Sequence, residues 1–366
     1  MEWYTINNVD TIDSPALVLY KDRIQYNIKQ AVNMVGDAQR LRPHAKTNKI
    51  AEVCNMMMTT GIAKFKCATI AEAEMLGMIG AKDVLLAYQP GGPKIQRLYN
   101  LTQKYPATKY SSLIDNVETA KNIGNLFDAH HTELNVYIDV NNGMNRSGIK
   151  TADAGALFTN VLTVKGISII GLHGYDGHIR DTNVADRQHR SDGAFEQLKN
   201  LQHSIHAAHG VMLKLVTSGS PTFPTHAKRE GIECSPGTFV FWDWGYKTAV
   251  PDEPFELAAL VVTRIISIID ETTIATDLGH KSVAAENPLP RVHFLNAPEI
   301  TPVGQSEEHL VAKVPDSTKF NVGDVLYGVP VHICPTVALY ERANVVENGN
   351  VVEVWKVIAR DRTITV

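Results

Sequence analysis

The segment Leu41-Arg42-Pro43-His44-Ala45-Lys46-Thr47-Asn48-Lys49 gathers four basic side chains where an apolar run ends. Burying a charge beside a strand costs free energy, so basic residues at this position indicate a functional role. Pro43 favours an extended backbone, so Lys46 would project from the end of that strand. A lysine in such a place can lose enough water to become neutral and nucleophilic, as Schiff-base formation requires. For a lone lysine, a solvated helix start would be the simpler interpretation.

Small residues form two further segments of interest, Thr217-Ser218-Gly219-Ser220 and Ser235-Pro236-Gly237-Thr238. Their backbone N–H groups could close around a phosphate, and their hydroxyl groups would add donors. Either segment alone is a weak signal, because glycine and serine are also common in ordinary loops.

A possible metal pair, His332 and Cys334, lies in Pro330-Val331-His332-Ile333-Cys334-Pro335. On the strand that we expect at 326–334 the two side chains would share one face. Imidazole and thiolate together suit zinc. A lone His-x-Cys is usually coincidence, so this pair needs other support.

These residues follow a repeating pattern of short apolar runs and amphipathic stretches. Helices are clearest at 22–35 and 186–208. Eight such units in about 230 residues predict a closed (β/α)8 barrel, although an open doubly wound sheet would show the same period. The eight expected strands are 16–20, 41–44, 65–68, 84–87, 110–114, 135–140, 167–172 and 211–216.

The pattern changes to strands and turns near residue 245. We expect a barrel domain at 14–245 and a mostly antiparallel β domain at 246–366, with residues 1–13 as a candidate extra strand of the second. Asn348-Gly349 between apolar runs predicts a hairpin turn. The expected strands of this domain are 256–269, 273–277, 291–295, 310–313, 326–334 and 351–358.

Composition limits the partners. The chain has 366 residues, a formal net charge of −4, and acidic and basic residues mixed throughout. That balance argues against nucleic acid and against a membrane surface, and favours a small-molecule partner. No signal-peptide pattern or long apolar stretch occurs, so we expect a cytoplasmic protein. The four cysteines form no C-x-x-C pair and are expected to be reduced.

Several of these segments carry a resemblance. Arg-Pro-His-x-Lys-Thr at 42–47 resembles the cofactor-lysine motif of the D-threonine aldolase and D-serine dehydratase family, whose barrel is of the alanine racemase type (fold type III). Segments 13–17, 143–148, 171–178 and 330–335 are also similar to the family, in its order. The resemblance runs from about Asp13 to Arg360.

The resemblance implies pyridoxal 5'-phosphate as cofactor, with Lys46 rather than Lys49 holding it as a Schiff base. It implies catalytic candidates at Lys46, Tyr175 and His178, the last two without an assigned proton transfer. The implied cofactor contacts are Lys46, His44, Arg146, Tyr175, Ser218, Gly219, Ser220, Gly237 and Thr238.

The resemblance also implies a divalent metal on His332 and Cys334. In the family, dehydratases have His-x-Cys and bind zinc, whereas aldolases have His-x-Asp and prefer manganese or similar ions. Zinc is therefore favoured here, with manganese or magnesium as alternatives. Asn48 stands where many relatives have a second histidine, and Asp181 lies near where aldolase relatives have one, which leaves the detailed reaction open.

The reaction that the resemblance implies is cleavage of a D-3-hydroxy amino acid to glycine and an aldehyde. Dehydration of D-serine or D-3-hydroxyaspartate to a keto acid and ammonia is the first alternative, and an amino-acid racemase is the second. The β domain argues against a non-catalytic cofactor-binding protein, and a barrel enzyme without this cofactor is the remaining alternative. By analogy with the family we expect a homodimer.

Overall fold

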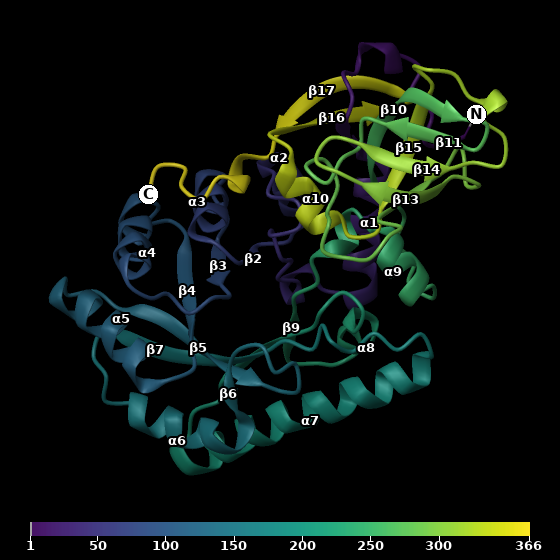
Figure 1. The fold of residues 1–366 in the computed structure, drawn as a ribbon. Helices are drawn as coiled ribbons and strands as arrows, with labels where there is room; N and C mark the ends of the chain where they lie inside the picture. Colours follow the sequence, from purple (N-terminus) through teal and green to yellow (C-terminus); the bar gives the residue numbers. More distant parts are fainter. Residues whose placement is uncertain (1) are drawn as a thin grey trace. The chain divides into compact units, whose positions relative to one another are not determined.

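The computed structural model describes residues 2–366 of the chain, which forms two compact units (Figure 1). Neither unit is continuous in sequence. The β unit comprises Met1–Gln30, Thr47–Val53 and Thr238–Arg360, and the barrel unit comprises Ala31–Lys46, Cys54–Gly237 and Asp361–Val366. Two stretches of the barrel unit therefore end inside predicted functional segments, at Lys46 and at Gly237.

The barrel unit is built on a parallel sheet with the strand order β2-β3-β4-β5-β7-β8-β9, and the short β6 pairs with β5. Its two edges are joined by the extended segment 41–44, because Leu41 bridges Cys234 of β9 and His44 bridges Lys66 of β2. Eight parallel positions therefore follow one another around the barrel. The strands are β2 (Lys64–Cys67), β3 (Asp83–Leu86), β4 (Lys109–Ile114), β5 (Leu134–Asn141), β6 (Ile149–Lys150), β7 (Ile167–Gly174), β8 (Lys214–Thr217) and β9 (Ile232–Cys234).

Helices connect these strands, as parallel pairing requires. The longest, α7 (Val184–His209), begins where the Asn183 side chain accepts from two backbone N–H groups and ends at Gly210, whose φ of 71° suits glycine. The other helices of the connections are α2 (Ala51–Thr59), α3 (Ile70–Met78), α4 (Pro93–Lys104), α5 (Val117–Ala129), α6 (Thr151–Val161) and α8 (Phe223–Ala227).

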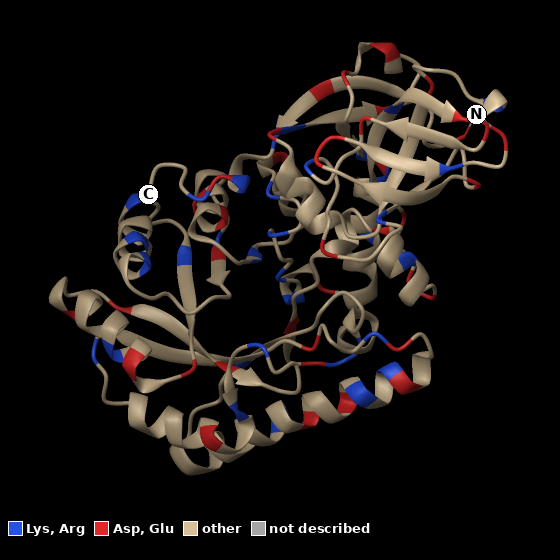
Figure 2. Ribbon diagram, viewed as in Figure 1, with Lys and Arg blue, Asp and Glu red and all other residues tan. Residues whose placement is uncertain are grey.

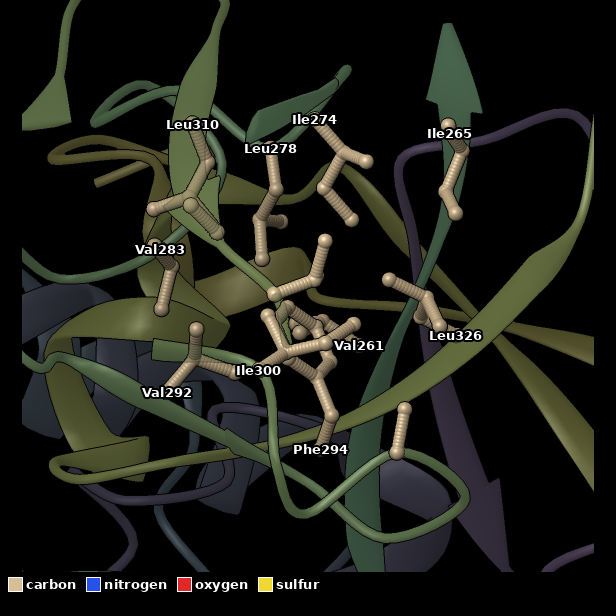
Figure 3. Packing of buried hydrophobic residues seen from close by; sticks show 13 residues of the cluster. Val261, Ile265, Ile274, Leu278, Val283, Val292, Phe294, Ile300, Leu310 and Leu326 are labelled. Carbon is tan, nitrogen blue, oxygen red and sulfur yellow. The ribbon is translucent and has the colours of Figure 1, made fainter. Parts of the chain in front are cut away.

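The β unit contains a mostly antiparallel sheet with the path β13-β14-β11-β10-β1-β16-β17, to which β15 adds through β10 and β12 through β15. A cluster of thirteen buried apolar side chains fills its interior, with Leu278, Phe294 and Leu310 among them (Figure 3). Its strands are β1 (Ala16–Tyr20), β10 (Ala259–Asp270), β11 (Thr273–Thr276), β12 (Val292–Phe294), β13 (Thr301–Gln305), β14 (Leu310–Lys313), β15 (Val325–Pro330), β16 (Arg342–Glu347) and β17 (Asn350–Lys356), and the remaining helices are α1 (Lys21–Val35), α9 (Trp244–Ala249) and α10 (Ile333–Leu339).

One strand was assigned to the wrong sheet by its sequence pattern. Residues 16–20 do form a strand, but β1 pairs antiparallel with β10 and parallel with β16 instead of opening the barrel. All five of its residues are buried, and a fully buried strand has the same sequence pattern in either kind of sheet. The eighth barrel position is taken by β9, which was too short to predict. Residues 2–13 hold a 3₁₀ helix at Val9–Thr11 and no strand, so the expected extra strand is wrong.

The predicted hairpin is confirmed. Asn348 and Gly349 join β16 to β17 with φ values of 51° and 73°. A two-residue turn with both φ values positive matches the twist of antiparallel strands, and asparagine and glycine adopt it at the least cost.

Charged side chains of both signs are interspersed over the ribbon of each unit (Figure 2). This distribution agrees with the small net charge and forms no block of one sign. Within residues 2–366, the helices are too short or too polar for any of them to cross a bilayer.

Candidate active site

Lys46 lies in a turn directly after the extended segment 41–44 that joins β9 to β2. The backbone N–H groups of Arg42 and His44 donate to the carbonyls of Cys234 and Pro236 at 2.8 and 2.9 Å. The ring of His44 also accepts from the Lys46 N–H at 3.3 Å through Nδ1. The backbone around Lys46 is therefore fixed by neighbouring strands, so its side chain has a defined starting point.

Arg42 anchors this segment. Its buried guanidinium lies 2.6 Å from Glu233 and 2.6 Å from Asp83. Burial lowers the pKa of Arg42, but these two carboxylates outweigh that effect and hold the pKa above its usual value. Two carboxylates thus balance the Arg42 charge inside the barrel, and the ion pairs hold the segment that leads to Lys46.

Three cations surround the ring of Tyr175, which follows β7. Its centroid lies 6.0 Å from Lys46 Nζ, 5.4 Å from Lys66 Nζ and 4.8 Å from Arg146 Cζ. The sequence predicted Lys46, Arg146 and Tyr175 as parts of one site, and the structure brings them together. Lys66 was missed, because its alternation with Phe65 in a short strand also suits a solvent-facing lysine.

A second missed group is the buried pair of His173 and Asp139, whose Nδ1 and Oδ1 atoms lie 2.7 Å apart. Asp139 also accepts from Gln89 at 2.9 Å and from Ser147 at 3.0 Å. Burial raises the pKa of Asp139 and the bond from His173 more than offsets it, while burial lowers the pKa of His173. Together with Arg146 this pair lines a small cavity.

The loop after β8 takes its shape from Asp176. This buried carboxylate accepts from Gly219 N at 2.9 Å and Thr222 Oγ1 at 2.7 Å, and lies 2.7 Å from His226 Nε2. Burial raises the pKa of Asp176, but His226 and the other donors lower it to about 2. A Cβ at Gly219 would lie 2.9 Å from Gly177 Cα, so only glycine fits this approach. Because the Gly219 N–H donates to Asp176, the role of Gly219 is to shape the loop.

The two small-residue loops meet in the barrel unit. Gly237 N donates to Ser220 Oγ at 3.3 Å, and Ser218 Oγ donates to the carbonyl of Gly219 at 2.7 Å. Thr217 Oγ1 is buried and has no hydrogen-bond partner among residues 2–366, and the same holds for His173 Nε2. Buried polar atoms without partners are rare and point to a missing ligand. Hydroxyl donors on one side and cations around an aromatic ring on the other fit a phosphorylated, anionic cofactor.

His178 and Asp181 lie on the segment between β7 and α7. The His178 Nε2 atom would be 3.0 Å from a Cβ placed on Gly143, so this ring packs against the turn that carries Arg146. Burial lowers the pKa of His178, which favours the neutral ring. Asp181 pairs with Arg190 at 2.7 Å, so its carboxylate has a structural partner.

The β unit carries the predicted metal pair, but not on a strand. β15 ends at Pro330, His332 is the N-cap of α10 and Cys334 lies in the first turn of that helix. The two residues therefore do not share the face of a strand, as the sequence pattern predicted, although their side chains do interact. Burial lowers the pKa of His332, but the hydrogen bond with Cys334 and the carboxylate of Glu286 raise it to about 9. Thr47 Oγ1 lies 3.1 Å from Cys334 Sγ.

An imidazole, a thiol and a carboxylate that contacts the imidazole could offer a metal two ligands and an orienting group. Within residues 2–366 no group of three or more His, Cys, Asp or Glu side chains is arranged to hold a metal ion. The donor chemistry fits a soft divalent ion, and a complete site needs further ligands beyond this pair.

The parallel barrel and the antiparallel sheet together define the alanine-racemase-like fold. The chain belongs to the family described as "Alanine racemase, N-terminal domain", whose model matches residues 19–243. A second model, "Putative serine dehydratase domain", matches residues 258–346.

Relatives resemble the chain over most of its length. A D-threonine aldolase of Arthrobacter sp is 25% identical and covers 95% of this chain and 93% of its own. A 3-hydroxy-D-aspartate aldolase of Paracoccus denitrificans (strain Pd 1222) is 26% identical, with 96% and 93% covered. A D-threo-3-hydroxyaspartate dehydratase of Delftia sp. (strain HT23) is 24% identical, with 94% and 97% covered. Both lyase reactions therefore occur among the relatives.

Solved structures support the fold. The D-threonine aldolase from Filomicrobium marinum has a TM-score of 0.89 at 24% identity and covers 97% of this chain and 98% of its own. The D-threo-3-hydroxyaspartate dehydratase from Delftia sp. HT23 has a TM-score of 0.82 at 22% identity, with 94% and 97% covered. These similarities extend through both units.

Proposed function

We propose that this chain is a pyridoxal-phosphate-dependent lyase acting on D-3-hydroxy amino acids, and that it cleaves them to glycine and an aldehyde. The observation that carries the proposal is the group of Lys46, Arg146 and Tyr175 at one end of the barrel. The aldolases and dehydratases among the relatives support the reaction class.

The residues divide the work between holding and proton transfer. Lys46 would hold the cofactor through its side-chain amine, and the same amine, when free, would serve as a base. Arg146 would offer a permanent charge and donors to the ring, and burial lowers the pKa of His173 beside Asp139. In the barrel unit, Ser218, Ser220 and Gly237 would hold the phosphate. When bound, the cofactor supplies an electron sink for charge that develops at the α-carbon.

A divalent metal on His332 and Cys334, with zinc favoured over manganese or magnesium, is the second part of the proposal. Such an ion supplies a Lewis acid for the substrate's 3-hydroxyl group. Glu286 would orient His332 by accepting from its Nδ1. Cys334 also gives the dehydratase alternative its support, because a thiolate and an imidazole suit zinc, the metal of the dehydratase branch that the chain resembles.

We further propose that the chain is a cytoplasmic homodimer without nucleic-acid or membrane partners. The small net charge and the mixed charge pattern support the absence of nucleic-acid and membrane partners, and the dimer is proposed by analogy with the family. Sedimentation of the purified protein as a monomer would overturn the dimer.

The first experiment is product analysis with purified, metal-reconstituted protein on D-threonine and D-serine. Glycine and acetaldehyde from D-threonine support the aldolase. A keto acid and ammonia identify the dehydratase, whereas conversion to the L-amino acid identifies a racemase. No reaction and no visible absorbance after incubation with the cofactor would reject the class.

Two pairs of variants assign the residues. Lys46→Ala is expected to lower turnover by about 10³-fold or more, whereas the nearby Lys49→Ala retains it. Cys334→Ala is expected to remove the metal requirement together with most of the activity, and the buried Cys54→Ala is its matched control. Turnover that is insensitive to Cys334→Ala would reject the metal pair.

A further inference from the structure

Lys66 is a second buried lysine in the barrel, and the proposed reaction does not use it. It lies on β2 and is 2% exposed. Its ammonium donates to Ser235 Oγ at 2.5 Å, and Ser235 Oγ in turn donates to the carbonyl of Thr217 at 3.0 Å. The hydroxyl proton of Ser235 is thus committed to the carbonyl, which leaves its lone pair to accept from Lys66.

The charge of Lys66 has no direct counter-ion. Within residues 2–366, no carboxylate oxygen lies within ion-pair distance of its Nζ, whereas the equally buried Arg42 has two. Burial and the positive charge of Lys46 lower the pKa of Lys66 to about 7. A buried ammonium with only a hydroxyl partner is costly. A simple link between strands could be made by an uncharged side chain, so a structural role alone does not explain a lysine here.

The surroundings of Lys66 are those of the proposed cofactor. Its Nζ lies 5.4 Å from the ring centroid of Tyr175, which Lys46 and Arg146 also approach. The remaining charged groups that act on it are Asp139 and Asp176, each engaged by a histidine. Lys66 and Lys46, the lysine that would hold the cofactor, thus both approach the ring of Tyr175.

We propose that Lys66 is a positioning residue for the cofactor ring, and that its ammonium faces an acceptor atom of that ring and favours the ring's less protonated states. The inference rests on the proposed function and deepens it. Lys66 contacts the segment 235–238 only at its first residue, Ser235, and its Nζ lies 5.4 Å from the ring centroid of Tyr175, so we choose the cofactor ring and not the phosphate as its partner. An anionic ring then supplies the counter-charge that the protein itself does not provide.

The test is a pH titration of the visible absorbance of the cofactor-loaded protein. Removing a nearby positive charge makes a bound group keep its proton to higher pH. Lys66→Met is therefore expected to raise the midpoint of the absorbance change by about one pH unit or more. Lys66→Arg retains the charge and is expected to stay near the wild-type midpoint. Lys109→Met, at the exposed start of β4, is the matched control and leaves the midpoint unchanged.

A second neutral variant covers the case in which Lys66→Met does not fold. Lys66→Gln keeps a donor for Ser235 and removes only the charge, so it is expected to shift the midpoint in the same direction. An unchanged midpoint in every folded neutral variant would overturn the role of Lys66 while leaving the proposed function intact. Failure of the wild-type protein to take up the cofactor would overturn both.

Affinity measurements distinguish the ring from the phosphate. Binding of pyridoxal, which lacks the phosphate, and of pyridoxal phosphate is compared in the wild type and in Lys66→Met. The proposal expects both affinities to fall by a similar factor. Weaker binding of the phosphorylated form alone, with an unchanged midpoint, would assign Lys66 to the phosphate and overturn the proposal.

Discussion

The apolar cluster of the β unit and the interior of the barrel unit bury different kinds of side chain. The interior cluster of the β unit is made only of apolar residues (Figure 3). The barrel unit also has an apolar core, but it buries Arg42, Lys66, Asp139 and Asp176 among its strands and loops. Apolar burial stabilises a fold without demanding partners, whereas every buried charge must be compensated. Burying these charges therefore costs free energy in the barrel unit, and the apolar cluster of the β unit has no such cost.

The partners of the buried charges show which segments of the site these charges hold in place. Arg42 has two carboxylates, and Asp139 and Asp176 each have a histidine. Each of these groups supports a segment that carries a predicted site residue. Lys66 has only a hydroxyl, which is why it is the group for which a bound ligand is the natural partner. The buried charges that have an ionisable partner therefore differ from Lys66, which has only a hydroxyl partner and is the charge that we expect to face a ligand.

The largest effect is expected from removing Asp176. Asp176→Ala leaves His226, Thr222 and the Gly219 N–H without their acceptor and is expected to lower the free energy of unfolding by about 3–5 kcal/mol. Denaturant unfolding measures this change. Glu196→Ala, an exposed carboxylate within α7, is the control and is expected to change stability little. Equal effects of the two variants would remove the distinction drawn between buried charges and surface charges.

The apolar cluster of the β unit gives the next prediction. Leu310→Ala creates a cavity on β14 and is expected to cost about 2–5 kcal/mol, whereas Ile274→Val on β11 is expected to cost about 0.5–1.5 kcal/mol. Thermal unfolding measures both. The absorbance midpoint of the bound cofactor should stay at its wild-type value in either variant below the melting transition. A moved midpoint would mean that the β-unit cluster is not purely structural.

The pH dependence of stability is a third prediction. The folded-state pKa of Asp176 is about 2, against 3.8 for an unperturbed carboxyl. A depressed carboxyl pKa contributes stability that is complete above about pH 4 and is lost as the pH falls through about pH 2. Asp176→Asn is expected to lack this part of the acid-induced loss. Acid unfolding curves of the wild type and the variant, superimposed after normalisation, would contradict it.

Sequence patterns were most successful where local chemistry decides the structure. The hairpin at Asn348-Gly349 follows from two residues that accept positive φ values. The resemblance to the family implied Lys46, Arg146 and Tyr175 as parts of one site, and the cationic groups of Lys46 and Arg146 do lie near the Tyr175 ring. Strand order alone could not have chosen these residues, although a parallel barrel does bring the carboxyl ends of its strands to one edge.

The failures have one physical cause, which is that periodicity does not report what a segment packs against. β1 is buried on both faces and could belong to either sheet. Lys66 follows Phe65 in the alternation of apolar and polar residues that a surface strand shows. In a barrel strand both faces are covered, and Lys66 is buried. His332 and Cys334 were expected on a strand and lie at the start of α10, where residues two apart can still meet.

The smallest effect is expected at an exposed ion pair of the β unit. Lys281 lies 2.6 Å from Glu307 and 3.3 Å from Glu308, and all three side chains are more than half exposed. These two carboxylates raise the pKa of Lys281, but water and salt screen the attraction, and ordering three long side chains opposes it. Lys281→Ala is therefore expected to leave the melting temperature unchanged within measurement error at physiological salt. A clear loss of stability that persists at high salt would show that the fold depends on Lys281 as it depends on Asp176. The distinction between buried and exposed charges would then be wrong.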